Sequence, residues 1–598
     1  MRFRILLSVL AISLFVLASG CGSVKNCPVC GTTTNGPYGV IDVMPVPEHN
    51  PTGEPGGPFN SFDISVADSL NHRFYVSDRI GLDVAVFDTI NNVAVNIIGG
   101  DNSVAGAGDF PAPCIKDASG NDIIPPLVSA LGNFTRFGCR TAVPGGIPFH
   151  IPGFGASTHL GGFPGAQCCA ARANGVNPLS APDGEVLTAD GKTLFVANGS
   201  SSVVVFDLTT MDLTKNPPTP PTVIADFPTG QGPDYDGCTA TPCGPGGNGT
   251  GTLNPNGIAP CIASANGRAF SDPTCGDLRA DEMSYDEKDH ILLVANGDPG
   301  FPFVTLVDVS HIIGRTGTPQ QQHCLPATPN QPYGPNNFPT CILGQIYYDG
   351  APANNTNVAV DDQTAAGFSC PDPSTNAPSG VSGFASAATG GRDVPCHHGP
   401  FNSAFGSTTV ALAGIGGSAF NPNTGHFFVT NANATTDLTV GTVDEIDPGI
   451  GTTHGPIVVN SFIMPNCMPT SIVQGPGNNF LVGCGDHDGV AFPPNEYVID
   501  GTSGGMIATI DKVGGVDETW YNPGDNRYYL AARDMPTGAV MGVIDAKTNQ
   551  WLTNVPTGSN SHSISADSVT NHIFVPLQSG PRCTTQSANG CVAVYAQQ

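Results

Sequence analysis

Two Asp-Glu steps stand at matching places in this chain, at Asp281-Glu282 and Asp517-Glu518. Paired carboxylates can hold a hard cation such as Ca²⁺ or Mg²⁺, or can act as general acid and general base. Single candidates occupy the same place elsewhere: Asp63, Asp183 and His562. The candidate metal ligands are Asp63, Asp183, Asp281, Glu282, Asp517 and Glu518, and His562 is the candidate catalytic base.

The elements that position these residues belong to a repeat with seven copies. The first copy reads FDISVADSLNHRFYVSD over 62–78, and VAVFD follows over 84–88. Each copy combines an alternating strand, a turn rich in Asp, Asn, Gly and Pro, a β-branched and aromatic strand, and a third strand. Four antiparallel strands per copy are typical of propeller blades. The sequence predicts an all-β fold, a seven-bladed β-propeller forming one domain over 38–598.

The candidate residues lie 13 positions before the central residue of each second strand, for example Asp63 before Val76. They therefore begin the innermost strands and face the central channel or its mouth. The third and sixth copies stand across the ring, so both Asp-Glu steps and His562 would share one funnel. Three interpretations stay open: carboxylates that cap turns, a divalent-cation site, and acid–base catalysis. The segment 38–44, YGVIDVM, is predicted to complete the last blade and close the ring.

The second strands FYVSD, LFVAN, LLVAN and FFVTN, each followed by a strand that ends in Asp, resemble the YVTN-type propeller repeats of bacterial surface and periplasmic proteins. The resemblance covers about 38–598 apart from insertions. Related propellers include lactonases, the streptogramin lyase, quinoprotein subunits and many binding or scaffold proteins. Such a fold hosts several activities, so the resemblance does not choose among them.

Three long insertions are expected between blades. Successive second strands are 120, 98 and 135 residues apart in the first half of the repeat array, but only 53, 48 and 45 apart later. The excess falls at about 99–182, 226–280 and 315–415. If each insertion joins a fourth strand to the next first strand, all three emerge on one face and build a crown over the channel. The crown is either decoration and shielding, or the wall of a binding cleft.

The first twenty residues are predicted to be a signal peptide. Arg2 and Arg4 precede an apolar run, and small residues then lead to Cys21. This pattern resembles a bacterial lipoprotein signal, although Ala18 departs from the leucine preferred there. The resemblance implies a lipidated Cys21, an anchor and linker over 21–37, and an outer-membrane or cell-surface lipoprotein. Ordinary secretion with nearby cleavage is the alternative.

Export predicts disulfides among the other 18 cysteines. Cys27 and Cys30 are expected to form a small disulfide loop rather than a zinc site, and Cys396-His397-His398 a disulfide beside two loop histidines. No CxxC precedes a histidine, so c-type haem is not expected. The local pairs expected are Cys114–Cys139, Cys324–Cys341, Cys370–Cys396, Cys467–Cys484 and Cys583–Cys591.

Composition disfavours some classes of fold and of partner. The chain holds 76 Gly and 55 Pro in 598 residues, which disfavours helices, and its net charge of −28 disfavours nucleic acid as a partner. The favoured function is a non-enzymatic, lipid-anchored binding module of the cell envelope. It would act as a monomer on a protein partner or small ligand at its crowned face, and meet the membrane only through its anchor. The alternative is a hydrolase or lyase, lactonase-like or streptogramin-lyase-like, with Ca²⁺ or Mg²⁺ in the channel.

Overall fold

The computed structural model describes residues 37–46, 59, 62–79, 83–99, 182–198, 202–216, 218–219, 221–229, 280–297, 303–324, 340–348, 371–372, 377–378, 396–398, 414–432, 434, 440–450, 452, 455–485, 494–578, 580–583 and 590–598. Gly39–Ala596 is one compact unit, and Tyr38 and Gln597–Gln598 group with the N-terminal segment.

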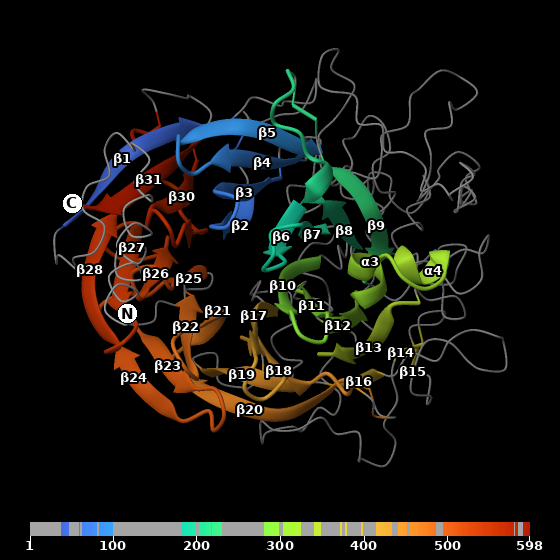
Figure 1. Ribbon diagram of the computed structural model, residues 1–598. Coiled ribbons are helices and arrows are strands. Elements are labelled where there is room, and N and C mark those ends of the chain that lie inside the picture. The colour runs from blue at the N-terminus through green and yellow to red at the C-terminus, as the bar shows by residue number, and fades with distance from the viewer. Residues whose placement is uncertain are drawn as a thin grey trace, which may run out of the picture. The chain divides into compact units, whose positions relative to one another are not determined.

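Seven sheets stand in a ring with their first strands innermost (Figure 1). Blade one comprises β2 (Phe62–Asp68), β3 (Arg73–Asp78), β4 (Asp83–Asp88) and β5 (Val93–Gly99). Blade two comprises β6 (Pro182–Leu187), β7 (Thr193–Asn198), β8 (Ser202–Asp207) and β9 (Thr222–Pro228). Blade three comprises β10 (Ala280–Asp286), β11 (Ile291–Asn296), β12 (Phe303–Asp308) and β13 (Ile342–Tyr347). Blade four comprises β17 (Ile415–Asn421), β18 (His426–Asn431), β19 (Val440–Asp447) and β20 (Ile457–Pro465), and blade five comprises β21 (Met468–Gln474), β22 (Asn479–Gly485), β23 (Glu496–Asp500) and β24 (Met506–Ile510). Blade six comprises β25 (Glu518–Asn522), β26 (Arg527–Ala532), β27 (Val540–Asp545) and β28 (Gln550–Pro556). Blade seven comprises β29 (Ser565–Ala566), β30 (Ile573–Leu577), β31 (Cys591–Gln597) and β1 (Tyr38–Pro45). The predicted all-β, seven-bladed propeller is confirmed.

The ring has two ends, which we name by the parts of the strands that lie there. The channel mouth is the end where the first strand of each blade begins. The turn face is the opposite end, where short turns join first to second strands and third to fourth strands. In blade one, Asp68 accepts the backbone N–H groups of Leu70 and Asn71, and His72 takes a φ of 55°. This local capping lets β2 reverse into β3 with its polar backbone groups satisfied.

Second strands are buried on both faces because each blade packs against two neighbours. Phe74 and Val76 of β3 are fully buried, and Phe74 stacks on Phe574 of blade seven at 5.0 Å between ring centroids. The hydrophobic clusters accordingly mix residues of adjacent blades, as where Val196 of β7 joins Val86 of β4. This shared core explains why the second strands read as continuous apolar runs.

Blade seven is closed by the N-terminal strand, as the sequence predicts. β1 is the outer neighbour of β31 in a sheet ordered β1-β31-β30-β29. The N–H of Gln598 donates to the Pro37 carbonyl at 3.0 Å, so β1 begins where β31 ends. Met44 of β1 is fully buried in the cluster between blades seven and one. Strands from both ends of the repeat region therefore form one blade.

One expected insertion is divided differently from the prediction. β13 is the fourth strand of blade three, so 309–341 joins third to fourth strands, and its described parts, 309–324 and 340–341, lie at the turn face. This segment carries the short helices α3 (Ser310–Gly314) and α4 (Pro319–Gln322), and blade two has a smaller analogue with the 3-10 helix η1 (Leu208–Thr210). Counting residues between second strands cannot tell which connection is long.

In the described part of the chain, no helix is long and apolar enough to cross a membrane.

The part of the third insertion after β13 starts from the channel mouth. Its strand β16 (Cys396–His398) pairs in parallel with β13 and becomes a fifth strand of blade three. A separate short ribbon consists of β14 (Pro371–Asp372) and β15 (Ala377–Pro378). Strand β16 therefore extends blade three at its outer edge, an arrangement that the repeat pattern does not predict.

Three of the expected cysteine pairs are disulfide-bonded: Cys324–Cys341, Cys467–Cys484 and Cys583–Cys591. The first lies at the turn face with α4 rather than in the crown. The pairs Cys114–Cys139 and Cys370–Cys396 lie outside the residues whose side chains are described.

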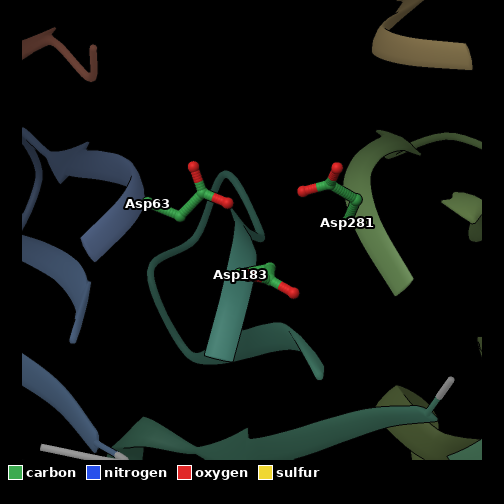
Figure 2. Close-up of side chains that lie close together, drawn as sticks. All are labelled: Asp63, Asp183 and Asp281. Carbon is green, nitrogen blue, oxygen red and sulfur yellow. The ribbon is translucent and has the colours of Figure 1, made fainter. Parts of the chain in front are cut away.

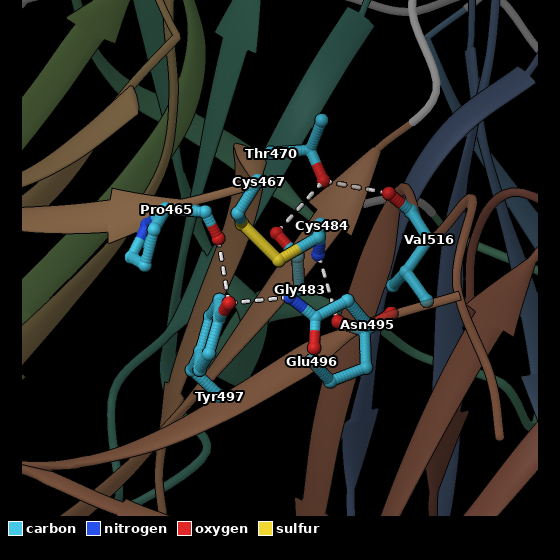
Figure 3. The surroundings of a disulfide bond; sticks show 9 residues. All are labelled: Pro465, Cys467, Thr470, Gly483, Cys484, Asn495, Glu496, Tyr497 and Val516. Atoms are coloured by element: carbon cyan, nitrogen blue, oxygen red, sulfur yellow. Dashed lines mark hydrogen bonds between the residues drawn. A yellow bond between two sulfur atoms is a disulfide. The ribbon is translucent and has the colours of Figure 1, made fainter. Parts of the chain in front are cut away.

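The Cys467–Cys484 disulfide fastens the inner hairpin of blade five (Figure 3). The Cys484 N–H donates to Glu496 at 2.7 Å, and burial raises the pKa of this carboxyl well above its usual range. We expect the double variant Cys467→Ala/Cys484→Ala to lose about 3 kcal/mol of unfolding free energy, because the bridge closes a 17-residue separation. Urea unfolding checks this, and a loss below about 1 kcal/mol would contradict a stabilising bridge.

Candidate functional site

Three aspartates from consecutive blades meet at the channel mouth. Asp63 of β2, Asp183 of β6 and Asp281 of β10 each offer an oxygen, and these oxygens lie within 4.8 Å of one another (Figure 2). Gly184 permits this convergence, since a Cβ there would overlap the Asp281 carbonyl. The spacing placed these residues at the starts of the innermost strands, where the structure has them, and their role as metal ligands stays a prediction. Their geometry suits a single cation.

An arginine of the same chain supplies a cation at this place. The Arg79 guanidinium donates through Nε to Asp183 and through Nη2 to Asp63, forming ion pairs with both carboxylates. Asp183 is fully buried, and the side chains of Arg79 and Asp63 are 10% and 13% exposed. Because a guanidinium offers two donors in a rigid fork, it can bridge two carboxylates that would otherwise repel. Two of the three candidate ligands are thus already paired.

A second arginine repeats this arrangement in blade six. Arg533 Nη1 lies 2.8 Å from Asp517, and its Nε donates to Asp534 at 3.1 Å. Asp517, and more weakly Asp63, raise the pKa of the guanidinium. Sequence reasoning missed both arginines, although a signal was present: each stands three residues after the central residue of its second strand, Arg79 after Val76 and Arg533 after Leu530.

The two glutamates of the Asp-Glu steps meet across the ring. Glu282 of blade three and Glu518 of blade six share a side-chain hydrogen bond. A carboxylate has no donor, so one member of the pair must be protonated. Burial is the main cause that raises the pKa of Glu282 to about 8 and that of Glu518 well above its usual range, and nearby Asp281, Asp63 and Asp517 act in the same direction.

This shared proton predicts a pH effect on stability. The unfolded chain releases the Glu282 proton near its usual pKa of 4.5, whereas the folded chain keeps it up to about pH 8. The pair's contribution is therefore fully present below pH 4.5 and is lost as the pH rises towards 8. We expect Glu282→Gln, whose amide oxygen can still accept from Glu518 and which has no titrating proton, to have an unfolding free energy about 2 kcal/mol higher than wild type at pH 8.

Urea unfolding at pH 5 and pH 8 measures this difference. The control is Asp511→Asn, which removes a carboxylate whose side chain is 73% exposed and should leave the pH slope unchanged. Equal slopes in wild type and Glu282→Gln would refute the shared proton.

His562 lies at the mouth but is held by backbone groups. Its Nδ1 faces the Asn560 carbonyl at 3.0 Å, its Nε2 faces the Phe62 carbonyl at 2.9 Å, and its ring stacks on Phe62. Nε2 also lies 3.5 Å from Asp63. Both ring nitrogens thus face backbone carbonyls, one in the segment of His562 itself and one in β2. This environment suits a donor that fixes the first strand, and its role as catalytic base stays a prediction.

Trp520 fills part of the channel. It comes from β25 of blade six and packs against the apolar cluster of blades one and two, which includes Val66 and Val196. These blades stand apart in the ring, so the indole reaches across the channel. Tyr285 of blade three packs on Phe195 of blade two, between the blades. Glu185, which accepts from Ser77 at 2.9 Å, is a further buried acid that the spacing did not indicate.

Several predicted sites lie outside the described residues. These are the signal peptide, the lipidation site Cys21, the Cys27–Cys30 loop and most of the crown. They remain predictions from sequence.

Comparisons with known proteins do not identify a family for this chain. No protein family matches the chain, and no curated protein does. Among solved structures, the chain is similar to one titled "Crystal Structure of Mitotic Checkpoint Complex", with 8% identity, a TM-score of 0.41 and 96% of each chain covered. A likeness this weak carries no argument about function. The assignment to seven-bladed propellers rests on the seven sheets themselves.

Proposed function

We propose that this chain is a non-catalytic binding module of the cell envelope, attached through a lipidated Cys21, which receives its partner at the crowned channel mouth. One observation supports this above the others: side chains from opposite blades span the channel. Glu282 bonds to Glu518, and Trp520 packs against the far wall. A hydrolase or lyase needs an open cavity in which an unengaged base faces the substrate. A binding module tolerates a filled channel.

The charge at the mouth indicates the chemistry of the partner. The four aspartates at the mouth outnumber the guanidinium groups of Arg79 and Arg533. Asp517 is the most open of these carboxylates, with 28% of its side chain exposed. The residual negative field favours a partner with amino or guanidino groups, such as a lysine-rich peptide segment.

A titration with charged peptides tests this proposal. The probes are a tetralysine amide and a tetraglutamate, added to the purified chain at low salt while binding is followed by fluorescence anisotropy. We expect tetralysine to bind and Asp517→Asn to weaken it about threefold or more, since a lost charge contact of roughly 0.7 kcal/mol changes affinity by that factor. The matched control is Asp289→Asn, at a turn-face carboxylate that is 41% exposed. Equal weakening by both variants would show that net charge alone attracts the peptide, and the proposal would fail.

A further inference from the structure

Three neighbouring turns on the turn face expose aliphatic side chains. Each turn begins with an aspartate that accepts the backbone N–H two residues later, and that second residue points outward. The exposed fractions of these residues are 65% for Leu70, 48% for Ile90 and 64% for Val569. We name Leu70, Ile90 and Val569 the apolar corner.

The three turns form one rigid group. The Ser568 N–H donates to Ser69 Oγ at 2.8 Å, which joins the turns that carry Val569 and Leu70. Thr89 Oγ1 donates to Asp567 at 2.5 Å, and the Thr89 N–H donates to the His72 carbonyl at 3.1 Å. The third turn, with Ile90, is therefore fixed to the other two. The aliphatic side chains need no rearrangement to present a common surface.

Other turns of the same design carry no aliphatic residue at this position. Ten further described turns have an Asp or Asn that accepts from the residue two positions later, and these residues are Lys192, Thr209, Thr214, Lys288, Ser310, Asn423, Gly449, Thr502, Gly524 and Lys547. Exposed aliphatic residues at this position are confined to adjacent blades one and seven. A concentration of this kind indicates a surface that meets something apolar.

The chain enters the ring at the same place. β1 begins where β31 ends, and Tyr595 near the end of β31 pairs with Ile573, directly after the Val569 turn. Only residues 22–36 separate Cys21 from the first described residue, Pro37. Fifteen residues span at most about 50 Å when extended, so a chain anchored at Cys21 keeps this edge near the lipid.

We propose that the apolar corner rests on the lipid surface to which the chain is tethered, so that the crowned mouth faces away from the membrane. This inference depends on the proposed anchor and adds a second, non-covalent membrane contact. The corner's carboxylates, Asp68, Asp88 and Asp567, are engaged by backbone N–H groups of their own turns. Its cationic side chain, Arg73, pairs with Asp88. Without free basic groups in these turns, a zwitterionic surface fits better than an anionic one.

Tryptophan reporters on vesicles test the proposal. The mature chain from residue 22, with a hexahistidine tag at its N-terminus and Trp551→Phe, is recruited to phosphatidylcholine vesicles that contain nickel-chelating lipid and brominated acyl chains. We expect emission from a Leu70→Trp reporter to be lost on recruitment and to return when imidazole releases the tag. The matched control is Thr502→Trp, in the turn of blade five that corresponds to the Ile90 turn, whose emission should stay unchanged.

Two further arms make the result decisive. A Val569→Trp reporter should be quenched in the otherwise native corner, and this quenching should be lost when Leu70→Ser and Ile90→Ser are added. Equal quenching of Leu70→Trp and Thr502→Trp would overturn the proposal. The absence of quenching in both would also overturn it, and would indicate that the apolar corner binds a protein instead of lipid. Because the tag supplies the tether, the outcome does not depend on native lipidation. A failed anchor would appear separately, as equal membrane recovery of the expressed wild type and Cys21→Ser chains.

Discussion

Arg79→Met is expected to lower the unfolding free energy by about 3–5 kcal/mol, because it leaves two buried carboxylates facing each other without their shared cation. Asp183 is fully buried and Asp63 nearly so, and both are ion-paired to the guanidinium. Methionine keeps most of the side-chain volume, so the loss reports charge rather than packing. Urea unfolding at pH 7 measures it.

The matched control is Arg315→Met. Arg315 lies 2.9 Å from Asp207, but its side chain is 42% exposed, and we expect its removal to cost less than about 1 kcal/mol. Similar costs for both variants would mean that Arg79 does not neutralise the aspartates at the channel mouth. Adding Asp183→Asn to Arg79→Met should recover part of the loss, since one unpaired carboxylate disappears.

Deleting Tyr38–Val46 is expected to abolish cooperative unfolding. The deletion removes β1 from blade seven, exposes the edge of β31, and takes Met44 and Val46 out of the core between blades seven and one. A ring that does not close loses contacts on both sides of the gap, and an open strand edge invites aggregation. Thermal unfolding followed by circular dichroism checks this outcome.

Point variants of the same strand separate closure from general fragility. Met44→Ala should cost about 2–5 kcal/mol because Met44 is fully buried, whereas Ile41→Ala should cost less than about 1 kcal/mol because Ile41 is 43% exposed. If the deleted chain still unfolds cooperatively at a similar temperature, β1 does not close the ring.

The blades and the closure were predictable because they depend on local chemistry. Each copy repeats a turn whose Asp or Asn caps its own backbone, followed by a strand buried on both faces, and such signals survive in a single sequence. The division of the third insertion by β13 was not predictable. Segment 309–341 adds residues between β12 and β13, and spacing alone cannot distinguish this from an insertion after β13.

The site was predictable in its acidic residues and not in its cations. Spacing placed Asp63, Asp183 and Asp281 together, and the count of blades placed Glu282 opposite Glu518. The arginines were not predicted because they occur in only two of the seven copies, at a position where the other copies have small or uncharged residues. Which carboxylates the arginines reach depends on how closely neighbouring first strands approach each other. Gly184 permits this close approach, and sequence spacing does not reveal it.

The central claim is that arginines and a shared proton, rather than a divalent ion, balance the acidic channel mouth. The most direct measurement is thermal unfolding of chelator-stripped protein with and without millimolar Ca²⁺ or Mg²⁺. The account predicts no change in the unfolding temperature. A site occupied a hundredfold above its dissociation constant would instead add about 2.7 kcal/mol of stability. Stabilisation of that size, lost in Asp281→Asn, would contradict the account and favour the cation-dependent enzyme.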